Sequence, residues 1–114
     1  MITTDDIRTE SGVLICPRCG DRNLHHGRVT VFDRAEDSSH TDVSTVVDGV
    51  STTHRMPSTE ADNPSRRRDG LIIEFRCEIC CDWDKFDSFL ELRIAQHKGQ
   101  TLLEWKFDQT DGVI

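Results

Sequence analysis

The sequence has no long apolar run. None of its 114 residues belongs to a stretch of about eighteen consecutive apolar side chains, the length that indicates a membrane-spanning helix, so no membrane association is expected. Residues 1–11 are polar and acidic and lack the apolar segment of a signal peptide. We therefore expect a cytoplasmic protein. In that reducing compartment, closely spaced cysteines indicate metal ligands rather than disulfides.

The sequence also lacks a convincing amphipathic helix, internal repeats and the common motifs of zinc enzymes. Neither His-x-Glu nor His-Glu-x-x-His, the motifs of zinc deaminases and proteases, occurs in it. Residues 16–19 have the Cys-Pro-x-Cys form of a dithiol oxidoreductase, but no helix follows to lower a thiol pKa. Some nucleases combine paired cysteine motifs with adjacent histidines, yet the helix that they need is missing. We expect no enzyme, with a dithiol redox or nuclease-like activity as the alternative.

Positive charge is scarce. The chain has 21 Asp and Glu against 14 Lys and Arg, a formal net charge of -7, which disfavours non-specific binding to nucleic acid. Hydrophobic residues make up only 35%, so a bound metal would supplement a thin core. The length suits one domain. We place it at residues 12–107, between a flexible N-terminal lead (1–11) and a C-terminal tail (108–114).

Against these absences stand four cysteines in two close pairs. Cys16 and Cys19 form one Cys-x-x-Cys motif, and Cys77 and Cys80 form another. At this spacing, two thiolates from one turn can share a tetrahedral Zn²⁺, and two such turns complete a closed four-cysteine site. We therefore predict one structural zinc ion bound by these four side chains. Iron is chemically possible, but zinc is the better candidate for a structural site.

A fifth cysteine and two histidines offer alternatives at this site. Cys81 occupies the position in the second motif that Gly20 occupies in the first. It is expected to be a small buried side chain, although it could replace Cys80 as a ligand or be a reactive thiol. His25 and His26 could support or replace a thiolate. Because four cysteines suffice, we expect both histidines to be polar residues that precede a strand.

The apolar pattern predicts short strands. Residues 28–33 and 71–77 alternate in the manner of strands, and residues 71–77 run directly into a cysteine pair. The polar segment 34–70 has the composition of an insertion. Within it, β-branched residues on both sides of Asp48-Gly49 predict a hairpin over 43–55, because this dipeptide tolerates a type I′ turn. The fold class is all-β, a small antiparallel sheet of five to seven strands centred on the metal site.

The segment 89–107 predicts a second hairpin with a defined register. With Lys98-Gly99 at the turn, Leu92 lies opposite Trp105 on an apolar face. The same register places Arg93 opposite Glu104 on the other face, where opposite charges meet. Two independent patterns thus favour one pairing, with one face buried and the other in solvent.

One basic cluster stands out in the acidic chain, formed by Arg66, Arg67 and Arg68. A nucleic-acid-binding function would have to use it. The simpler interpretation is a solvated loop among acidic neighbours.

The two cysteine motifs, each preceded by an apolar run, resemble the zinc-ribbon superfamily. Together with residues 25–29, 32–34 and 92–101, they are similar to small uncharacterised zinc-ribbon proteins of actinobacteria and their phages. This resemblance implies a ribbon fold but no activity. The resulting expectation is a non-enzymatic structural-zinc module that binds a macromolecular partner, with a protein as the favoured class. It would be a monomer or a homodimer paired through sheet edges.

Overall fold

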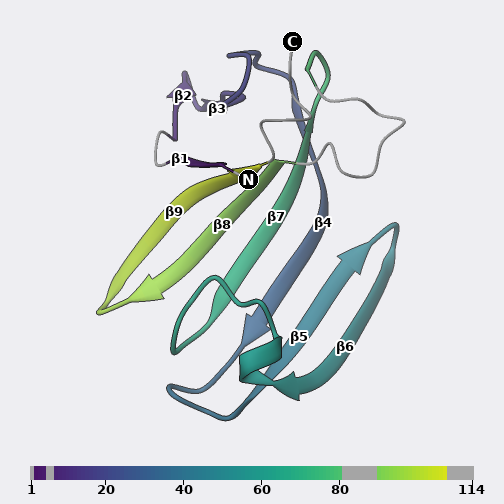
Figure 1. Ribbon diagram of the computed structural model, residues 1–114. Helices are drawn as coiled ribbons and strands as arrows, with labels where there is room; N and C mark the ends of the chain where they lie inside the picture. Colours follow the sequence, from purple (N-terminus) through teal and green to yellow (C-terminus); the bar gives the residue numbers. More distant parts are fainter. Residues whose placement is uncertain (1, 5–6, 81–89, 108–114) are drawn as a thin grey trace.

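The protein is built from antiparallel strands. The computed structural model describes residues 2–4, 7–80 and 90–107 (Figure 1). These residues form a seven-stranded sheet with the order β1-β9-β8-β7-β4-β5-β6 and a separate β2-β3 pair, with one 3-10 turn and no α-helix among them. The all-β prediction is confirmed. The elements are β1 (Ile2–Thr4), β2 (Thr9–Glu10), β3 (Val13–Leu14), β4 (Leu24–Asp33), β5 (His40–Val47), β6 (Val50–Pro57), η1 (Ser58–Glu60), β7 (Gly70–Cys77), β8 (Leu90–His97) and β9 (Gln100–Phe107).

The central pairing of the sheet joins β4 to β7. These strands run antiparallel, with Leu24 opposite Cys77. Because β4 begins just after the first cysteine pair and β7 ends at the second, this register brings both pairs to one end of the sheet. The register shifts between His26 and Val29, where two residues of β4 face one of β7 in a β-bulge.

The β8–β9 hairpin has the predicted register. Leu92 pairs with Trp105, and Arg93 pairs with Glu104. Lys98 and Gly99 have positive φ angles of 49° and 78°, as a two-residue type I′ turn requires. The alternation of apolar and charged residues therefore identified the correct pairing.

The insertion extends the main sheet. The predicted hairpin is present but longer than expected, because β5 and β6 together cover residues 40–57. Asp48 and Gly49 form its turn with φ angles of 51° and 79°. β5 also pairs with β4, placing Ser44 opposite Val31. Rather than an exposed excursion, the hairpin thus supplies two strands of the sheet, which its β-branched residues favour.

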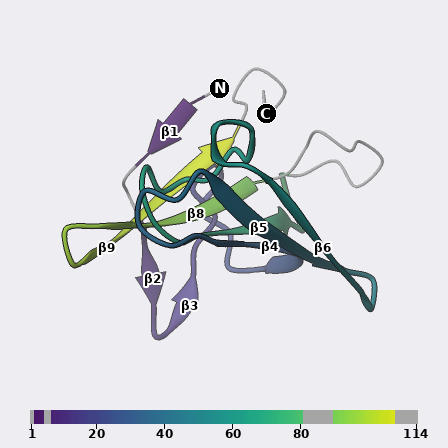
Figure 2. The ribbon, with the colours of Figure 1, turned by 90° about the horizontal axis from the view of Figure 1, so that it is seen from below.

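The N-terminal segment takes part in the fold as well. We expected residues 1–11 to be a flexible lead, but Ile2 pairs with Phe107 across β1 and β9, and Thr9 pairs with Leu14 across β2 and β3. The β2–β3 pair lies to one side of the main sheet (Figure 2). The predicted C-terminal tail (108–114) and Cys81 lie outside the described residues. In the described part of the chain, no helix is long and apolar enough to cross a membrane.

Two small cores lie on opposite faces of the sheet. The first surrounds the cysteines and contains Cys16, Cys77, Leu90, Trp105 and Phe107. The second lies at the far end of β4 and β7 on the other face, where the chain after β6 covers it; its buried members are Phe32, Ala61 and Ile72. Each core therefore covers only half of one face.

Beyond the first core, the same face of the sheet is open. Leu103, Ile94, Leu71 and Val31 follow one another across four adjacent strands, and Val46 lies on the neighbouring strand β5. We call these five residues the open face. Val31, Val46 and Leu103 are 42%, 48% and 43% exposed. The apolar face predicted for the β8–β9 hairpin is therefore buried only near the cysteines, since nothing among the described residues covers its other half.

Candidate metal centre

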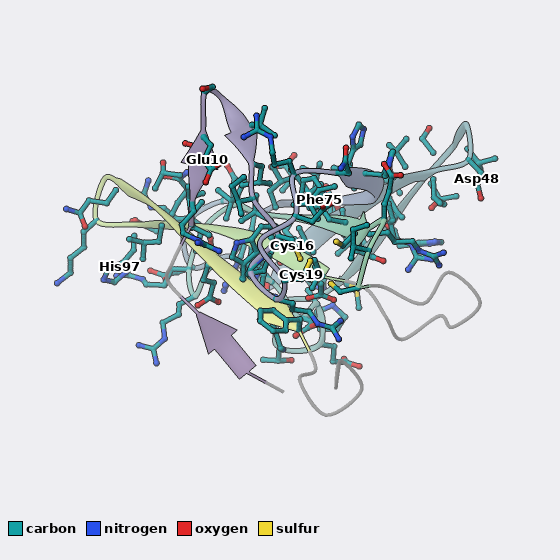
Figure 3. All side chains as sticks on the ribbon, turned by 90° about the horizontal axis from the view of Figure 1, so that it is seen from above. Glu10, Cys16, Cys19, Asp48, Phe75 and His97 are labelled. Carbon is teal, nitrogen blue, oxygen red and sulfur yellow. The ribbon has the colours of Figure 1, made fainter. Side chains whose placement is uncertain are left out.

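The four predicted cysteines converge at the end of the sheet where β4 begins and β7 ends. The Sγ atoms of Cys16 and Cys80 are 3.6 Å apart, and those of Cys19 and Cys77 are 3.5 Å apart. All four sulfur atoms lie within 4.8 Å of one another. The shortest contacts join one motif to the other, so the cluster links two segments almost sixty residues apart. Figure 3 shows Cys16 and Cys19 close to the sheet and to Phe75.

This spacing fits a single tetrahedral metal ion. With metal–sulfur bonds of about 2.3 Å, tetrahedral geometry places sulfur atoms about 3.8 Å apart. The sulfur–sulfur distances of 3.5 and 3.6 Å lie close to that value, and all four sulfur atoms lie within 4.8 Å of one another. Four cysteines this close can bind one metal ion, and four thiolate ligands fill its tetrahedral shell. Cys16 and Cys77 are buried, whereas Cys19 is exposed and Cys80 is intermediate, so the site lies at the rim of the first core.

The first cysteine turn closes on itself through the backbone. The amide of Gly20 donates to the Cys16 carbonyl at 3.0 Å, and the amide of Cys16 donates to the Asp21 carbonyl at 2.9 Å. Gly20 has a φ of +81°, a conformation that side chains with a Cβ disfavour. Glycine at this position therefore lets the chain turn back after Cys19.

The second turn is held by hydrogen bonds within itself and to the segment that follows the first turn. The amide of Ile79 donates to the Cys77 sulfur at 3.4 Å, and the amide of Glu78 donates to the Asn23 carbonyl at 3.0 Å. The Glu78 carboxylate also lies 2.7 Å from His25 Nε2. Contrary to the expectation that the histidines precede a strand, β4 begins at Leu24 and includes them. Neither histidine belongs to the four-cysteine cluster.

The thiols differ in their readiness to ionise. Burial raises the pKa of Cys19 to about 11 and also raises the pKa of Cys80, which the Cys16 thiol increases further. At Cys77, burial opposes ionisation, but amide donation from Cys80 and Ile79 outweighs it and lowers the pKa. Of these three thiols, Cys77 is therefore the best prepared to bind as a thiolate. A metal ion must displace the protons of Cys19 and Cys80, so metal binding releases protons.

The arginine cluster is largely neutralised by nearby acids. Arg67 Nε donates to Asp37 at 2.7 Å, and Arg68 Nε donates to Glu36 at 2.8 Å. Hydrogen bonds and charge from Arg67 hold the pKa of Asp37 below its usual value. Arg66 makes no ion pair with any described residue. The cluster precedes β7 whereas the cysteines follow it, so the two features lie at opposite ends of the sheet, roughly 23 Å apart along this strand.

The structure also shows a cavity that the sequence did not indicate. It has a volume of about 570 Å³ and lies on the face opposite the open face, between the loop before β7 and the outer ends of β8 and β9. Pro64, Arg66, Ala95, Leu102 and Glu104 are among its lining residues. One sequence feature could have indicated this cavity, the adjacent leucines at 102 and 103. Because consecutive residues of a strand point to opposite faces, they imply apolar surface on both faces of β9.

Fold and site together define a small antiparallel β-sheet protein with a cluster of four cysteines that can bind one metal ion. No protein family, no curated protein and no solved structure matches the chain.

Proposed function

We propose that this protein is a non-enzymatic module in which one structural zinc ion stabilises a β-sheet that binds a protein partner. The observation that carries the zinc assignment is the cluster of four sulfur atoms within 4.8 Å of one another. Four thiolates suit zinc and leave it no open position for a substrate or an activated water. Two facing cysteine turns at the end of a sheet also suit the zinc-ribbon resemblance of the sequence.

Exposed apolar surface supports a protein as the partner. Val31, Val46 and Leu103 of the open face are each more than two-fifths exposed, and contiguous apolar patches of this kind often mark interaction sites. The net charge of -7 disfavours a polyanionic partner. The ion pairs of Arg67 and Arg68 point the same way, because much of the cluster's charge is already compensated.

The zinc assignment is tested by metal analysis and chelation. We expect one zinc ion per chain, released by a strong chelator together with the β-sheet circular dichroism signal. A protein that keeps this signal after complete zinc removal would contradict a structural role. Purified protein with a reducible Cys16–Cys19 disulfide and no zinc would instead support the redox alternative.

The nucleic-acid alternative has its own test. Labelled duplex DNA and single-stranded RNA are titrated at about 50 and 200 mM salt, and we expect no saturable binding. Two salt concentrations are used because phosphate contacts would make the affinity fall steeply between them. Strong salt-dependent binding that the Arg66→Ala variant weakens would favour nucleic acid over protein.

Sedimentation velocity on the same sample distinguishes a monomer from a homodimer paired through the open edge of β6.

A further inference from the structure

The outer edge of β9 is only partly occupied. β1 pairs with residues 105–107 alone, and no described strand pairs with residues 100–104 on that side. The type I′ turn at Lys98-Gly99 makes His97 and Gln100 the closing hydrogen-bonded pair. Because antiparallel pairing alternates, the backbone N–H and C=O groups of Thr101 and Leu103 then point away from β8. These four polar groups can accept a further strand.

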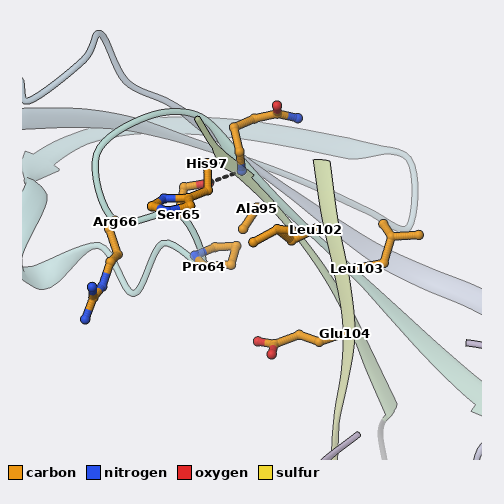
Figure 4. A pocket seen from close by; sticks show the side chains of 9 residues that line it. Pro64, Ser65, Arg66, Ala95, His97, Leu102, Leu103 and Glu104 are labelled. Carbon is orange, nitrogen blue, oxygen red and sulfur yellow. Dashed lines mark hydrogen bonds between the residues drawn. The ribbon is translucent and has the colours of Figure 1, made fainter. Parts of the chain in front are cut away.

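Exposed leucines lie on both faces of this open edge. Leu102 and Leu103 are 46% and 43% exposed. Leu102 and Leu103 both line the 570 Å³ cavity. The Leu103 side chain points to the other side of β9 from Pro64, Ala95 and Leu102 (Figure 4), and Leu103 pairs with Ile94 on the open face. A strand added here would find apolar contact for its side chains on either face.

The cavity carries one positive and one negative side chain. Arg66 and Glu104 lie on different sides of the apolar group formed by Pro64, Ala95 and Leu102 (Figure 4). In the described part of the chain, neither forms an ion pair. A ligand with an apolar centre and charges of both signs would therefore match this lining.

The wall of the cavity is held in place. Ser65 is 3% exposed, and its hydroxyl donates to the Asp69 carbonyl and accepts from the Gln96 amide. These bonds fix the loop before β7 to β8. The cavity is therefore formed before any ligand arrives, which lowers the entropy cost of binding.

We propose that residues 100–104 of β9 bind an extended peptide segment of another protein as an antiparallel strand continuing the line of β1. The bound segment places an apolar side chain opposite Leu102, above the cavity, and a basic side chain opposite Glu104. An acidic side chain further along the same face approaches Arg66. This assignment rests on the proposed protein-binding function and gives it a site and a partner chemistry. Adding a strand to a sheet edge is a general mode of peptide recognition.

The other candidates fit this edge less well. The outer edge of β6 is longer, but its exposed side chains include Ser51, Thr53 and Arg55, and the pocket that Arg55 lines is smaller, about 290 Å³, with mainly polar residues around it. Pairing of β9 with β9 of a second copy, centred on Leu102, would place Glu104 opposite an uncharged glutamine. In this register a second copy offers Glu104 no positive charge, whereas a peptide with a basic residue does.

The experiment uses a fluorescent synthetic peptide with the core lysine–valine–leucine–threonine–glutamate, which places lysine opposite Glu104 and leucine opposite Leu102. Binding is measured by fluorescence anisotropy with the zinc-loaded, full-length protein. One control peptide exchanges lysine and glutamate. A second replaces valine by proline, which removes a backbone donor that faces β9.

The matched protein variants are Thr101→Pro in β9 and Thr53→Pro in β6. Both positions direct their N–H outward by the same hairpin geometry, so neither substitution breaks a backbone hydrogen bond within the sheet. Each removes one cross-strand side-chain hydrogen bond, from Gln96 to Thr101 or between Ser44 and Thr53, so the two variants remain matched. We expect Thr101→Pro to weaken binding about tenfold or more and Thr53→Pro to leave it unchanged. Leu102→Ser should weaken binding by a similar factor. Both control peptides should bind more weakly than the probe.

Several results would overturn this assignment. These are binding that survives Thr101→Pro, equal loss with Thr53→Pro, no preference for the probe over the charge-exchanged peptide, or concentration-dependent dimers that Thr101→Pro abolishes. Zinc content and circular dichroism are recorded on the same samples. A folded, zinc-loaded protein that ignores the probe therefore refutes the β9 site and leaves the zinc module intact, whereas loss of zinc or fold counts against the module itself.

Discussion

Replacing Cys77 by serine should unfold the protein under conditions in which a neighbouring substitution is tolerated. Cys77 is fully buried, its sulfur is 3.5 Å from that of Cys19, and it accepts an amide hydrogen bond from Ile79. Serine preserves the size of the side chain but is a poor zinc ligand. The variant therefore removes the metal while it changes the volume of the core very little.

The expected loss is large because the metal supports most of one core. Of the five buried residues in the first core, Cys16 and Cys77 belong to the four-cysteine cluster that we propose to bind zinc. Leu90, Trp105 and Phe107 remain, and each contributes roughly 1.5–3 kcal/mol by burial. A structural zinc ion contributes about 10–16 kcal/mol at pH 7. This equals or exceeds the net stability of about 5–15 kcal/mol that is usual for a domain, so the variant should not fold at ordinary temperature.

The assay is thermal unfolding followed by circular dichroism, with zinc measured on the same samples. Ile79→Ser is the matched control, because Ile79 lies between the two ligands of the second turn, is 68% exposed, and contributes its backbone amide rather than its side chain. It should retain one zinc and unfold within a few degrees of the native protein. Cooperative unfolding of Cys77→Ser at the native temperature would refute the reasoning.

Three further predictions concern packing and charge. Trp105 is fully buried, so Trp105→Ala should lower the free energy of unfolding, measured in urea, by about 3–5 kcal/mol. Trp105→Phe should lower it by much less, because the indole Nε1 has no hydrogen-bond partner among the described residues and none is lost. Gly70→Ala should lower the free energy of unfolding by about 1–3 kcal/mol, because the new Cβ would overlap the Asn63 side chain of the covering loop. Gly27→Ala is the control: its Cβ would have 4.0 Å of clearance, so stability should change by no more than about 0.5 kcal/mol. Burial, with repulsion from Glu91, raises the pKa of Glu74, so the folded state disfavours its charged form. Glu74→Gln should stabilise the protein at pH 7, and the gain over wild type should shrink as the pH falls toward 4.5, the ordinary value; a constant gain would contradict it.

Local patterns predicted the elements of this fold better than their arrangement. The β8–β9 register followed from sequence because the two faces of the hairpin impose independent constraints. The same register places Leu92 opposite Trp105 on the apolar face and Arg93 opposite Glu104 on the charged face. The turn at Asp48-Gly49 was predictable for a similar reason, since few dipeptides accept two positive φ angles. Both features depend on residues near each other in the chain.

The second core could not be predicted in this way. Alternation along β7 places Leu71 and Ile73 on one face and Ile72 on the other, but it does not show what covers Ile72. In the structure, the chain after β6 folds back over that side and buries Ile72 with Phe32 and Ala61. Nothing in the local pattern of β7 shows which distant segment will cover each half of each face. The polar composition of residues 34–70 concealed both this cover and the pairing of the predicted hairpin with β4, which makes the hairpin part of the main sheet.

The candidate metal site shows the same division. Spacing alone selected the four cysteines, because a tetrahedral ion needs pairs of thiolates from tight turns. It could not show what brings the two pairs together, which depends on the pairing of Leu24 with Cys77. The partial neutralisation of the arginine cluster was equally invisible, since Arg67 and its partner Asp37 are thirty residues apart.

The bulge in β4 connects the metal centre to the rest of the sheet. The bulge shifts the register of β4 against β7 by one residue. On the cysteine side of the bulge Leu24 pairs with Cys77, and on the far side Val29 pairs with Ile73. Because side chains alternate, a strand without the bulge would turn either Leu24 or Val29 to the opposite face. With it, Leu24 packs against the core beside the cysteines while Val29 remains on the face of Ile73. One extra residue thus allows a single strand to complete the metal-centred core at one end and to place apolar side chains on the exposed surface at the other. The candidate metal centre and the proposed interaction surface therefore depend on the same strand, and we expect loss of the first to abolish the second.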